Sequence, residues 1–231
     1  MSLLSIPEAA RELDLDPSRV RALVSAGELR GLKLGERWAV ESAEVARRQR
    51  DPRPAGRPLK PVNAWGILSL ASGLDAPWLE PSVRWRLEQS LAFRGLAGVR
   101  ARLGQRAEVH RFRAHPGELR HLRKDSDLVN SGISAAGAYG LKLAPGDEVD
   151  GYVRARALKR MQRDHALEPV QIGPGNVVLR AVPDAAWHIN PKEGVAPIAA
   201  VAVDLADDPD PRSSRIGNDT IKRLDRDLKN S

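Results

Sequence analysis

The feature that most constrains the fold is a proline-rich stretch, Asp51 to Pro61, which reads DPRPAGRPLKP. It contains four prolines and no apolar periodicity. Proline removes a backbone amide donor and biases the preceding residue towards extended backbone, so a regular element does not continue through such a stretch. We therefore expect a semi-rigid linker over residues 51–62, which separates a small unit, residues 1–50, from a larger unit, residues 63–231.

The composition limits the possible classes of protein. Hydrophobic residues make up 42% of the chain and charged residues 29%, which is typical of a globular protein. The absence of cysteine excludes disulfides, thiolate metal sites and cysteine nucleophiles. Aromatic residues, at 4%, are too few for the stacking platforms of single-strand-binding proteins. Neither a secretory signal nor an apolar run of membrane-spanning length is visible, so we expect a cytoplasmic protein without a membrane partner.

The net charge of +7 is unevenly distributed along the chain. Residues 1–62 hold 12 Lys and Arg against 9 Asp and Glu, whereas residues 81–124 hold 11 against 3, a net charge of +8. A basic block of this kind suits phosphates or an acidic partner. An alternative is that its arginines only solvate the outer faces of helices.

The small unit begins with two helix-start signals. Ser5 and Glu8 have the spacing of a capping box, and Asp16 can cap a second helix whose first residue is Pro17. Gly27 can end this second helix in a left-handed conformation. After it, residues 29–40 alternate around a glycine turn and predict a hairpin, and residues 42–50 predict a closing helix.

The second helix has one apolar face and one polar face. The spacing turns three residues inward: Val20, Leu23 and Val24. It leaves five residues facing outward or at the edge: Ser18, Arg19, Arg21, Ala22 and Ser25. Two short helices joined by a tight turn, with Ser and Arg exposed on the second, have the layout of a helix-turn-helix.

Residues 3–50 resemble the excisionase and MerR-type winged helix-turn-helix family. The residues that carry the resemblance are Ser5, Glu8, Ala9 and Ala10, then Gly27-Glu28-Leu29 and Gly35-Glu36-Arg37-Trp38. The resemblance implies that the second helix contacts the major groove and the wing contacts the flanking backbone. The DNA-binding residues that we assign on this basis are Ser18, Arg19, Arg21, Ala22, Lys33 and Arg37.

The wing departs from the family pattern at one position. Glu36 stands where such wings usually carry a basic residue, which weakens the expected phosphate contact. Trp38 is expected to pack the hairpin against the helices and not to contact DNA.

The larger unit mixes helices and strands. Apolar patterns predict helices at 63–74, 80–103, 116–124, 154–165, 195–206 and 208–230, and strands at 107–115, 147–153 and 175–182. Residues 128–141 predict an extended lead into a helix of small residues. Because no repeated strand-helix-strand pattern is evident, the predicted fold class is α+β: an N-terminal winged helix-turn-helix plus a larger mixed α/β C-terminal domain.

Catalytic and metal-binding motifs are scarce. The five histidines form no metal-ligand spacing, and no phosphate loop or nucleophile elbow occurs, so we expect no enzyme, no metal and no cofactor. The one dense acidic group consists of Asp204, Asp207, Asp208 and Asp210, which could hold Mg²⁺. The simpler interpretation places Asp207 and Asp208 past a helix end and Asp210 at an N-cap. Asp204 interrupts an apolar run and requires a buried partner, for which Arg212 or Arg215 is expected.

The larger unit also resembles the C-terminal part of AbiEi-type antitoxins. The resemblance rests on four segments: SGISAAGAYGLKL, DEVDGYV, NVVLRAVP and VAPIAAVAVDLADDPDPRSSRIG. The motif residues that it assigns are Ser134, Asp204, Asp210 and Arg212. Members of that family join a DNA-binding winged helix to a domain that opposes a nucleotidyltransferase toxin, AbiEii, and they repress their own operon. The excisionase-like head differs from the usual AbiEi head.

These observations lead to one main hypothesis and two alternatives. The main one is a non-enzymatic antitoxin and autorepressor that opposes a nucleotidyltransferase toxin and binds double-stranded operator DNA, either as a homodimer or in tandem on repeated half-sites. The first alternative is an excisionase-like or one-component transcription factor whose larger domain senses a small ligand in an apolar pocket. The second is a nucleic-acid-processing enzyme with a metal at Asp204 to Asp210.

Overall fold

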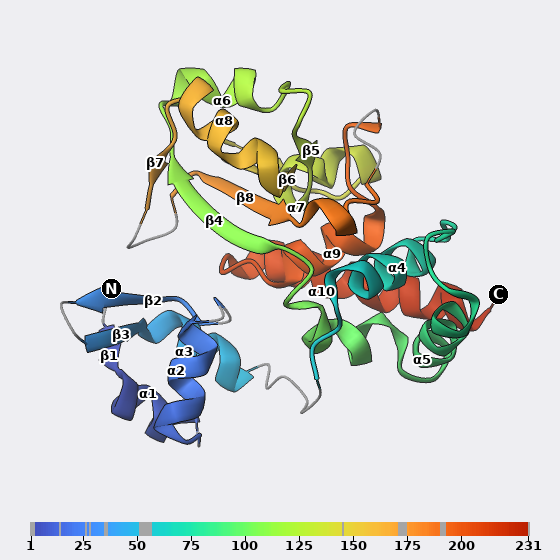
Figure 1. Cartoon of the computed structure of the whole chain (residues 1–231), viewed down its shortest axis with the longest axis horizontal. Helices are drawn as coiled ribbons and strands as arrows, with labels where there is room; N and C mark the ends of the chain where they lie inside the picture. Colours follow the sequence, from blue (N-terminus) through green and yellow to red (C-terminus); the bar gives the residue numbers. More distant parts are fainter. Residues whose placement is uncertain are drawn as a thin grey trace. The chain divides into compact units, whose positions relative to one another are not determined.

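The computed structural model describes residues 3–13, 15–25, 27, 29–34, 37–50, 57–144, 146–170, 175–189 and 193–230 (Figure 1). The chain divides into two compact units, Met1–Ala55 and Gly56–Ser231. We call the first the head and the second the larger unit, and each is described by itself.

The described part of the head contains a three-stranded antiparallel sheet and three helices. The elements are β1 (Leu3–Ser5), α1 (Ile6–Leu13), α2 (Pro17–Ser25), β2 (Gly31–Leu34), β3 (Arg37–Glu41) and α3 (Ser42–Arg50). The strand order is β1-β3-β2, so β3 pairs on both sides. The two predicted helices, the hairpin and the closing helix are confirmed. The short strand β1 was not predicted, because three residues carry no usable alternation.

Local hydrogen bonds begin and end the helices of the head as predicted. The Ser5 amide donates to Glu8 Oε2 at 2.7 Å, and the Glu8 amide donates to Ser5 Oγ at 3.4 Å, which completes the capping box. Asp16 Oδ1 accepts from the Ser18 amide at 2.7 Å. Gly27 lies just after α2 with φ of +69°, a conformation that glycine adopts without steric cost.

The head has its own small core. Its buried residues are Ile6, Ala9, Ala10, Val20, Leu23, Val24, Leu29, Val40 and Val45. Trp38, on β3, is partly buried and packs against this cluster, as predicted. The apolar face of α2 therefore holds the helix on the body of the head, which leaves its other face exposed.

The larger unit is a mixed sheet between helices. Its first helices are α4 (Pro61–Ala71), α5 (Pro81–Val99) and α6 (Pro116–Leu122), followed by α7 (Gly132–Ala135), α8 (Leu158–Asp164), α9 (Ile198–Ala206) and α10 (Pro211–Lys229). Its strands are β4 (Glu108–Arg113), β5 (Val129–Asn130), β6 (Val149–Arg154), β7 (Glu168–Pro169) and β8 (Val177–Val182). Short 3-10 helices lie at Arg100–Leu103, Ala136–Tyr139, Ala155–Ala157 and Asp184–Ala186.

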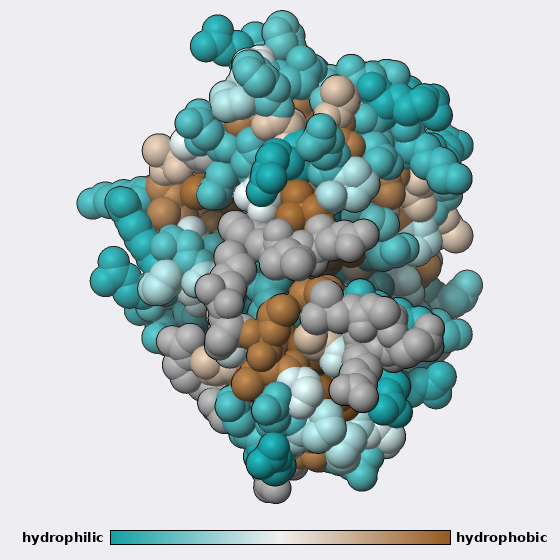
Figure 2. Space-filling model, turned by 90° about the vertical axis from the view of Figure 1, so that its left-hand side faces the viewer, coloured by the Kyte–Doolittle hydropathy of each residue, from teal (hydrophilic) through white to brown (hydrophobic). Residues whose placement is uncertain are grey.

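The sheet carries helices on both faces. Within the described residues it has five strands in the order β5-β6-β8-β4-β7, and β6 and β8 are parallel while the other pairs are antiparallel. Helices α6 and α8 cover one face, and α9 with its neighbours covers the other (Figure 1). Figure 2 shows mainly hydrophilic side chains in its upper part, where α6 and α8 lie, so these helices turn their polar faces outward.

The fold class and the predicted elements of the larger unit are confirmed, with three differences. Helix α4 begins at Pro61, so residues 61–62 belong to the helix and not to the predicted linker. Proline suits the first helical position because the backbone N–H at that position has no hydrogen-bond partner within the helix. Strand β7, only two residues long, was not predicted. Helix α5 is broken at Gly95, whose φ is +66°. Of the predicted turn IGPGN, residues 172–174 lie outside the described residues.

Helices α9 and α10 approach each other most closely at Gly217. A Cβ built on this glycine would lie 2.2 Å from the Ala206 amide nitrogen and 2.7 Å from the Ala202 carbonyl oxygen. Both atoms belong to the backbone of α9, so a larger residue requires one helix to move. Close packing of this kind makes even one added methyl group costly.

We expect Gly217→Ala to lower the free energy of unfolding by about 1–3 kcal/mol, the usual cost of overpacking. The matched control is Gly137→Ala, because a Cβ at Gly137 meets no atom within 4 Å and its φ is not positive. Urea unfolding followed by circular dichroism measures both. Equal stability of the two variants would contradict the close contact between α9 and α10.

Candidate nucleic-acid interface

The exposed face of α2 is the candidate DNA-contacting surface. Val20, Leu23 and Val24 are buried, as the spacing predicted. The predicted outward residues are all exposed: Ser18, Arg19, Arg21, Ala22 and Ser25. Within the described residues, no ion pair engages Arg19 or Arg21, so both guanidinium groups are available to phosphates or base edges.

The wing is only partly described. Lys33, on β2, is exposed and lies opposite Trp38 in the hairpin. The backbone of Arg37 pairs with Leu34, but the side chain of Arg37 lies outside the described residues, as do Gly35 and Glu36. The structure therefore places Lys33 beside the partly buried Trp38. Contact between Arg37 and the flanking DNA backbone stays a prediction.

Two other arginines of the head are engaged within the fold. Arg30 Nε lies 3.5 Å from Glu44 Oε1, and Arg47 Nη2 donates to Glu44 Oε2 at 3.0 Å. Glu44 is buried in α3, so the Arg30 contact joins α3 to the start of the hairpin, whereas the Arg47 contact lies within α3. Arg19 and Arg21 on α2 are exposed, as are Lys33 on β2 and Arg11 on α1.

The comparisons with known proteins bear on this unit alone. Residues 3–51 match a family model described as a helix-turn-helix domain. The comparison with curated proteins gave no match, and the comparison with solved structures gave none either. The head is thus a helix-turn-helix domain, which supports DNA binding and a regulatory role.

Several charges of the predicted basic block are used inside the larger unit. Arg84 pairs with Asp75 and with Glu88, and Arg100 Nη2 lies 2.9 Å from Asp207 Oδ1. Other exposed members of the block lie on different elements: Arg86 and Arg94 on α5, Arg113 on β4 and Arg120 on α6. The net charge of residues 81–124 is therefore distributed over several surfaces.

The four predicted antitoxin-motif residues make separate contacts within the fold. Ser134 Oγ accepts from the Asp150 amide at 2.9 Å. Asp210 caps α10 as predicted, because its Oδ2 accepts from the Ser213 amide at 2.8 Å. Arg212 is exposed and donates to the Lys142 carbonyl at 3.1 Å.

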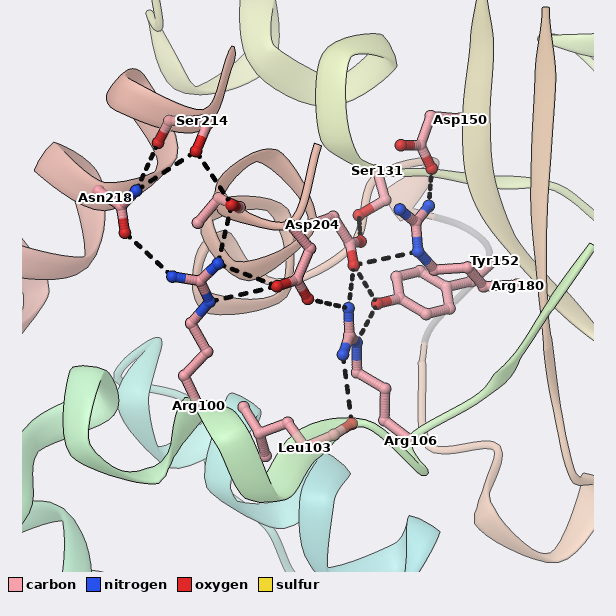
Figure 3. A network of polar contacts seen from close by, with 12 residues as sticks. Arg100, Leu103, Arg106, Ser131, Asp150, Tyr152, Arg180, Asp204, Ser214 and Asn218 are labelled. Atoms are coloured by element: carbon pink, nitrogen blue, oxygen red, sulfur yellow. Dashed lines mark hydrogen bonds and ion pairs between the residues drawn. The ribbon is translucent and has the colours of Figure 1, made fainter. Parts of the chain in front are cut away.

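The fourth motif residue, Asp204, is buried in a polar network, and its expected partners were wrong (Figure 3). Its exposed fraction is 1%, and Oδ1 lies 2.5 Å from Arg106 Nη2 and 3.1 Å from Arg180 Nε. Neither Arg212 nor Arg215 contacts it. Both are exposed side chains in the first turns of α10, while Arg106 and Arg180 reach Asp204 from the sheet side.

Two hydroxyls complete the network around this carboxylate. Ser131 Oγ donates to Asp204 Oδ2, and Tyr152 Oη donates to Asp204 Oδ1 at 2.9 Å while it accepts from Arg106 Nε at 2.9 Å. Burial raises the pKa of the Tyr152 hydroxyl well above its ordinary value, so this group keeps its proton and remains a donor. Arg180 also pairs with Asp150, as Figure 3 shows. The network joins α9 to β6 and β8.

Sequence reasoning missed the other members of this network, although a signal was present. Arg180 interrupts the apolar run VVLRAV and Asp150 interrupts VDGYV, in the same way that Asp204 interrupts its helix. A charge within a buried run requires a buried partner of opposite sign. Comparing all such interruptions would have suggested Arg180 as a partner for the carboxylates.

Other kinds of site find little support among the described residues. No group of three or more His, Cys, Asp or Glu side chains gathers there in a way that could hold a metal ion. A hollow at the end of α8 is lined by four polar or charged residues, Lys159, Gln162, Arg163 and Glu168, together with Ala166 and Leu167. Within the same part of the chain, no helix has the length and apolar character needed to cross a membrane.

We expect Asp204→Asn to lower the free energy of unfolding by about 3–5 kcal/mol, because Arg106 and Arg180 lose the buried carboxylate that they share. Among the described residues, Arg180 then keeps only the Asp150 carboxylate, and Arg106 keeps only that of Asp207 at 3.5 Å. Tyr152→Phe, which removes one hydroxyl, should cost about 1–2 kcal/mol. The control is Asp219→Asn, at an exposed residue of α10. Loss of its surface ion pair with Lys222 should change the free energy of unfolding by less than about 1 kcal/mol. Urea unfolding compares them, and a small effect at Asp204 would contradict the network.

Proposed function

We propose that this protein is a DNA-binding regulator that recognises its own operator through α2 and represses its own operon. The observation that carries the proposal is the exposed face of α2, on which Arg19 and Arg21 stand without ion-pair partners among the described residues, within a helix-turn-helix domain. Arginine forks can bind guanine edges in the major groove, and the amide end of α2 and Lys33 can bind the flanking phosphates. Because one head makes few contacts, two copies bind two half-sites.

The second part of the proposal concerns the larger unit. It acts without catalysis, as an antitoxin that opposes a nucleotidyltransferase toxin encoded beside it. Its support is the resemblance of residues 65–224 to AbiEi-type antitoxins, which is strongest at Asp204-Leu205 and Asp210-Pro211-Arg212. In this chain, Asp204 is buried and paired with Arg106, so it maintains the fold of the larger unit and does not contact the partner itself. Asp210 caps α10 and is exposed.

The DNA-binding part predicts a specific loss. In Arg19→Ala/Arg21→Ala, affinity for the DNA upstream of the protein's own gene should fall at least tenfold, since each arginine-base contact is worth about 1–3 kcal/mol. The salt dependence should also weaken, because fewer counterions are released. Electrophoretic mobility shifts at several salt concentrations measure both effects.

The charge-matched control is Lys222→Ala/Arg223→Ala, which removes two exposed positive charges from α10. Its binding should match that of the unmodified protein. Unchanged binding in the α2 variant, or an equal loss in the α10 variant, would show that α2 is not the reading surface.

The antitoxin part predicts protection in a growth assay. Expression of a nucleotidyltransferase encoded beside this gene should stop growth, and co-expression of the full chain should restore it. Arg19→Ala/Arg21→Ala should still protect when both genes are driven from foreign promoters, because protection does not require operator binding. Absence of protection, or of any such neighbouring gene, would remove the antitoxin role and leave the DNA-binding role intact.

A further inference from the structure

Helix α5 exposes a continuous row of side chains on its outer side. We call this row the α5 stripe; its residues, all exposed, are Ser82, Trp85, Arg86, Gln89, Ala92 and Phe93. The opposite side of the helix, which includes Leu87 and Leu91, is buried against the rest of the larger unit. Figure 1 shows α5 beside α4 and α10, and both helices pack against it.

Two large aromatic residues make this surface unusual for the chain. Phe93 is 87% exposed and Trp85 is 62% exposed. The remaining four tryptophans are buried or partly buried, and Phe112, the other phenylalanine, is 3% exposed. A chain with so few aromatic residues thus leaves two of them in solvent on one helix. Neighbouring exposed apolar side chains often mark interaction sites, and tryptophan is enriched among the residues that dominate binding energy.

The charge on this surface favours an acidic partner. Arg86 lies within the stripe, and the exposed Arg94 follows it. None of the exposed residues from Ser82 to Ala97 is a carboxylate, and Glu88 is bound to Arg84 Nε at 2.8 Å. A second copy of the chain would place arginines against arginines, whereas an acidic surface complements them.

The geometry favours a helical partner. Trp85 and Phe93 are eight residues apart, about 12 Å along a helix axis, so an occupant needs roughly three turns to reach both. The apolar face of a second helix, with anchors at i, i+3, i+4 and i+7, fits such a row.

The stripe is also fixed to the body of the larger unit. At the break in α5, the Asp225 carboxylate of α10 accepts from the Leu96 and Ala97 amides. This contact caps the second segment of α5. The first segment, which carries both aromatic residues, is held against the larger unit by its buried residues Leu87 and Leu91. The surface is therefore formed before a partner arrives, which reduces the entropy lost on binding.

We infer that the α5 stripe is the docking surface for a protein partner that presents an amphipathic helix with acidic flanks. The inference deepens the proposed function and rests on it only for the biological role of that partner, the toxin. The surface itself is argued from exposure, charge and helix geometry.

The test uses the full chain and two synthetic 18-residue peptides. Both carry Leu at i, i+3, i+4 and i+7; one has Glu at the flanking positions and the other Lys. Fluorescence anisotropy of labelled peptide should show the Glu peptide binding at least tenfold more tightly than the Lys peptide. Trp85→Ala/Phe93→Ala should weaken binding of the Glu peptide at least tenfold, and Arg86→Ala should reduce its salt dependence. The control variant is Val109→Ala, an exposed apolar residue on β4.

Three results would overturn the inference. The first is no binding of the Glu peptide, or equal binding in Trp85→Ala/Phe93→Ala. The second is concentration-dependent self-association, measured by sedimentation, that the same variant abolishes, since the occupant is then a second copy. The third is binding of labelled oligothymidine that the variant abolishes, since the occupant is then single-stranded nucleic acid. Operator binding is measured on the same variant. If operator binding persists while one of these three results is obtained, the docking inference fails and the proposed DNA-binding function does not.

Discussion

A single buried carboxylate joins the two layers of the larger unit. Asp204 lies on α9, and its charge is shared by Arg106, from the segment before β4, and Arg180, from β8. Removing such ions from water costs several kcal/mol each, and only good geometry with further hydrogen bonds offsets that cost. Ser131 and Tyr152 supply those bonds. Any shift of α9 relative to the sheet leaves a buried charge without its partner, so the network restricts the helix to one position.

How much of this structure the sequence could predict depends on the distance between interacting residues along the chain. The capping box at Ser5 and Glu8 and the cap at Asp210 join residues three positions apart, so pattern alone locates them. Asp204 was recognised as needing a partner, but its partners stand between 24 and 98 positions away, and only tertiary structure selects among the many arginines. Strands β1 and β7 were missed because they are only three and two residues long, too short for an alternating pattern.

The distribution of charge is a second property that the sequence predicts only in part. The count of arginines between residues 81 and 124 is a property of the sequence, but their use is a property of the fold. Arg106 is buried and Arg84 and Arg100 are paired, while Arg86 lies on the α5 stripe. The net charge of +8 therefore overstates the positive potential of any one surface. In the head, Glu44 engages Arg30 and Arg47 in a similar way, while Arg19 and Arg21 stay exposed on one face of α2.

The separation of the network residues along the chain also affects the order in which the two units fold during synthesis. Arg106 and Asp204 are 98 positions apart, so their contact cannot form until synthesis has passed Asp204. The head completes its own core with Val45, within the first fifth of the chain. Domains generally fold as units during synthesis, the N-terminal one first. A ribosome-bound chain therefore carries a folded helix-turn-helix while its larger unit is still incomplete, with the apolar surfaces of that unit exposed to chaperones and proteases.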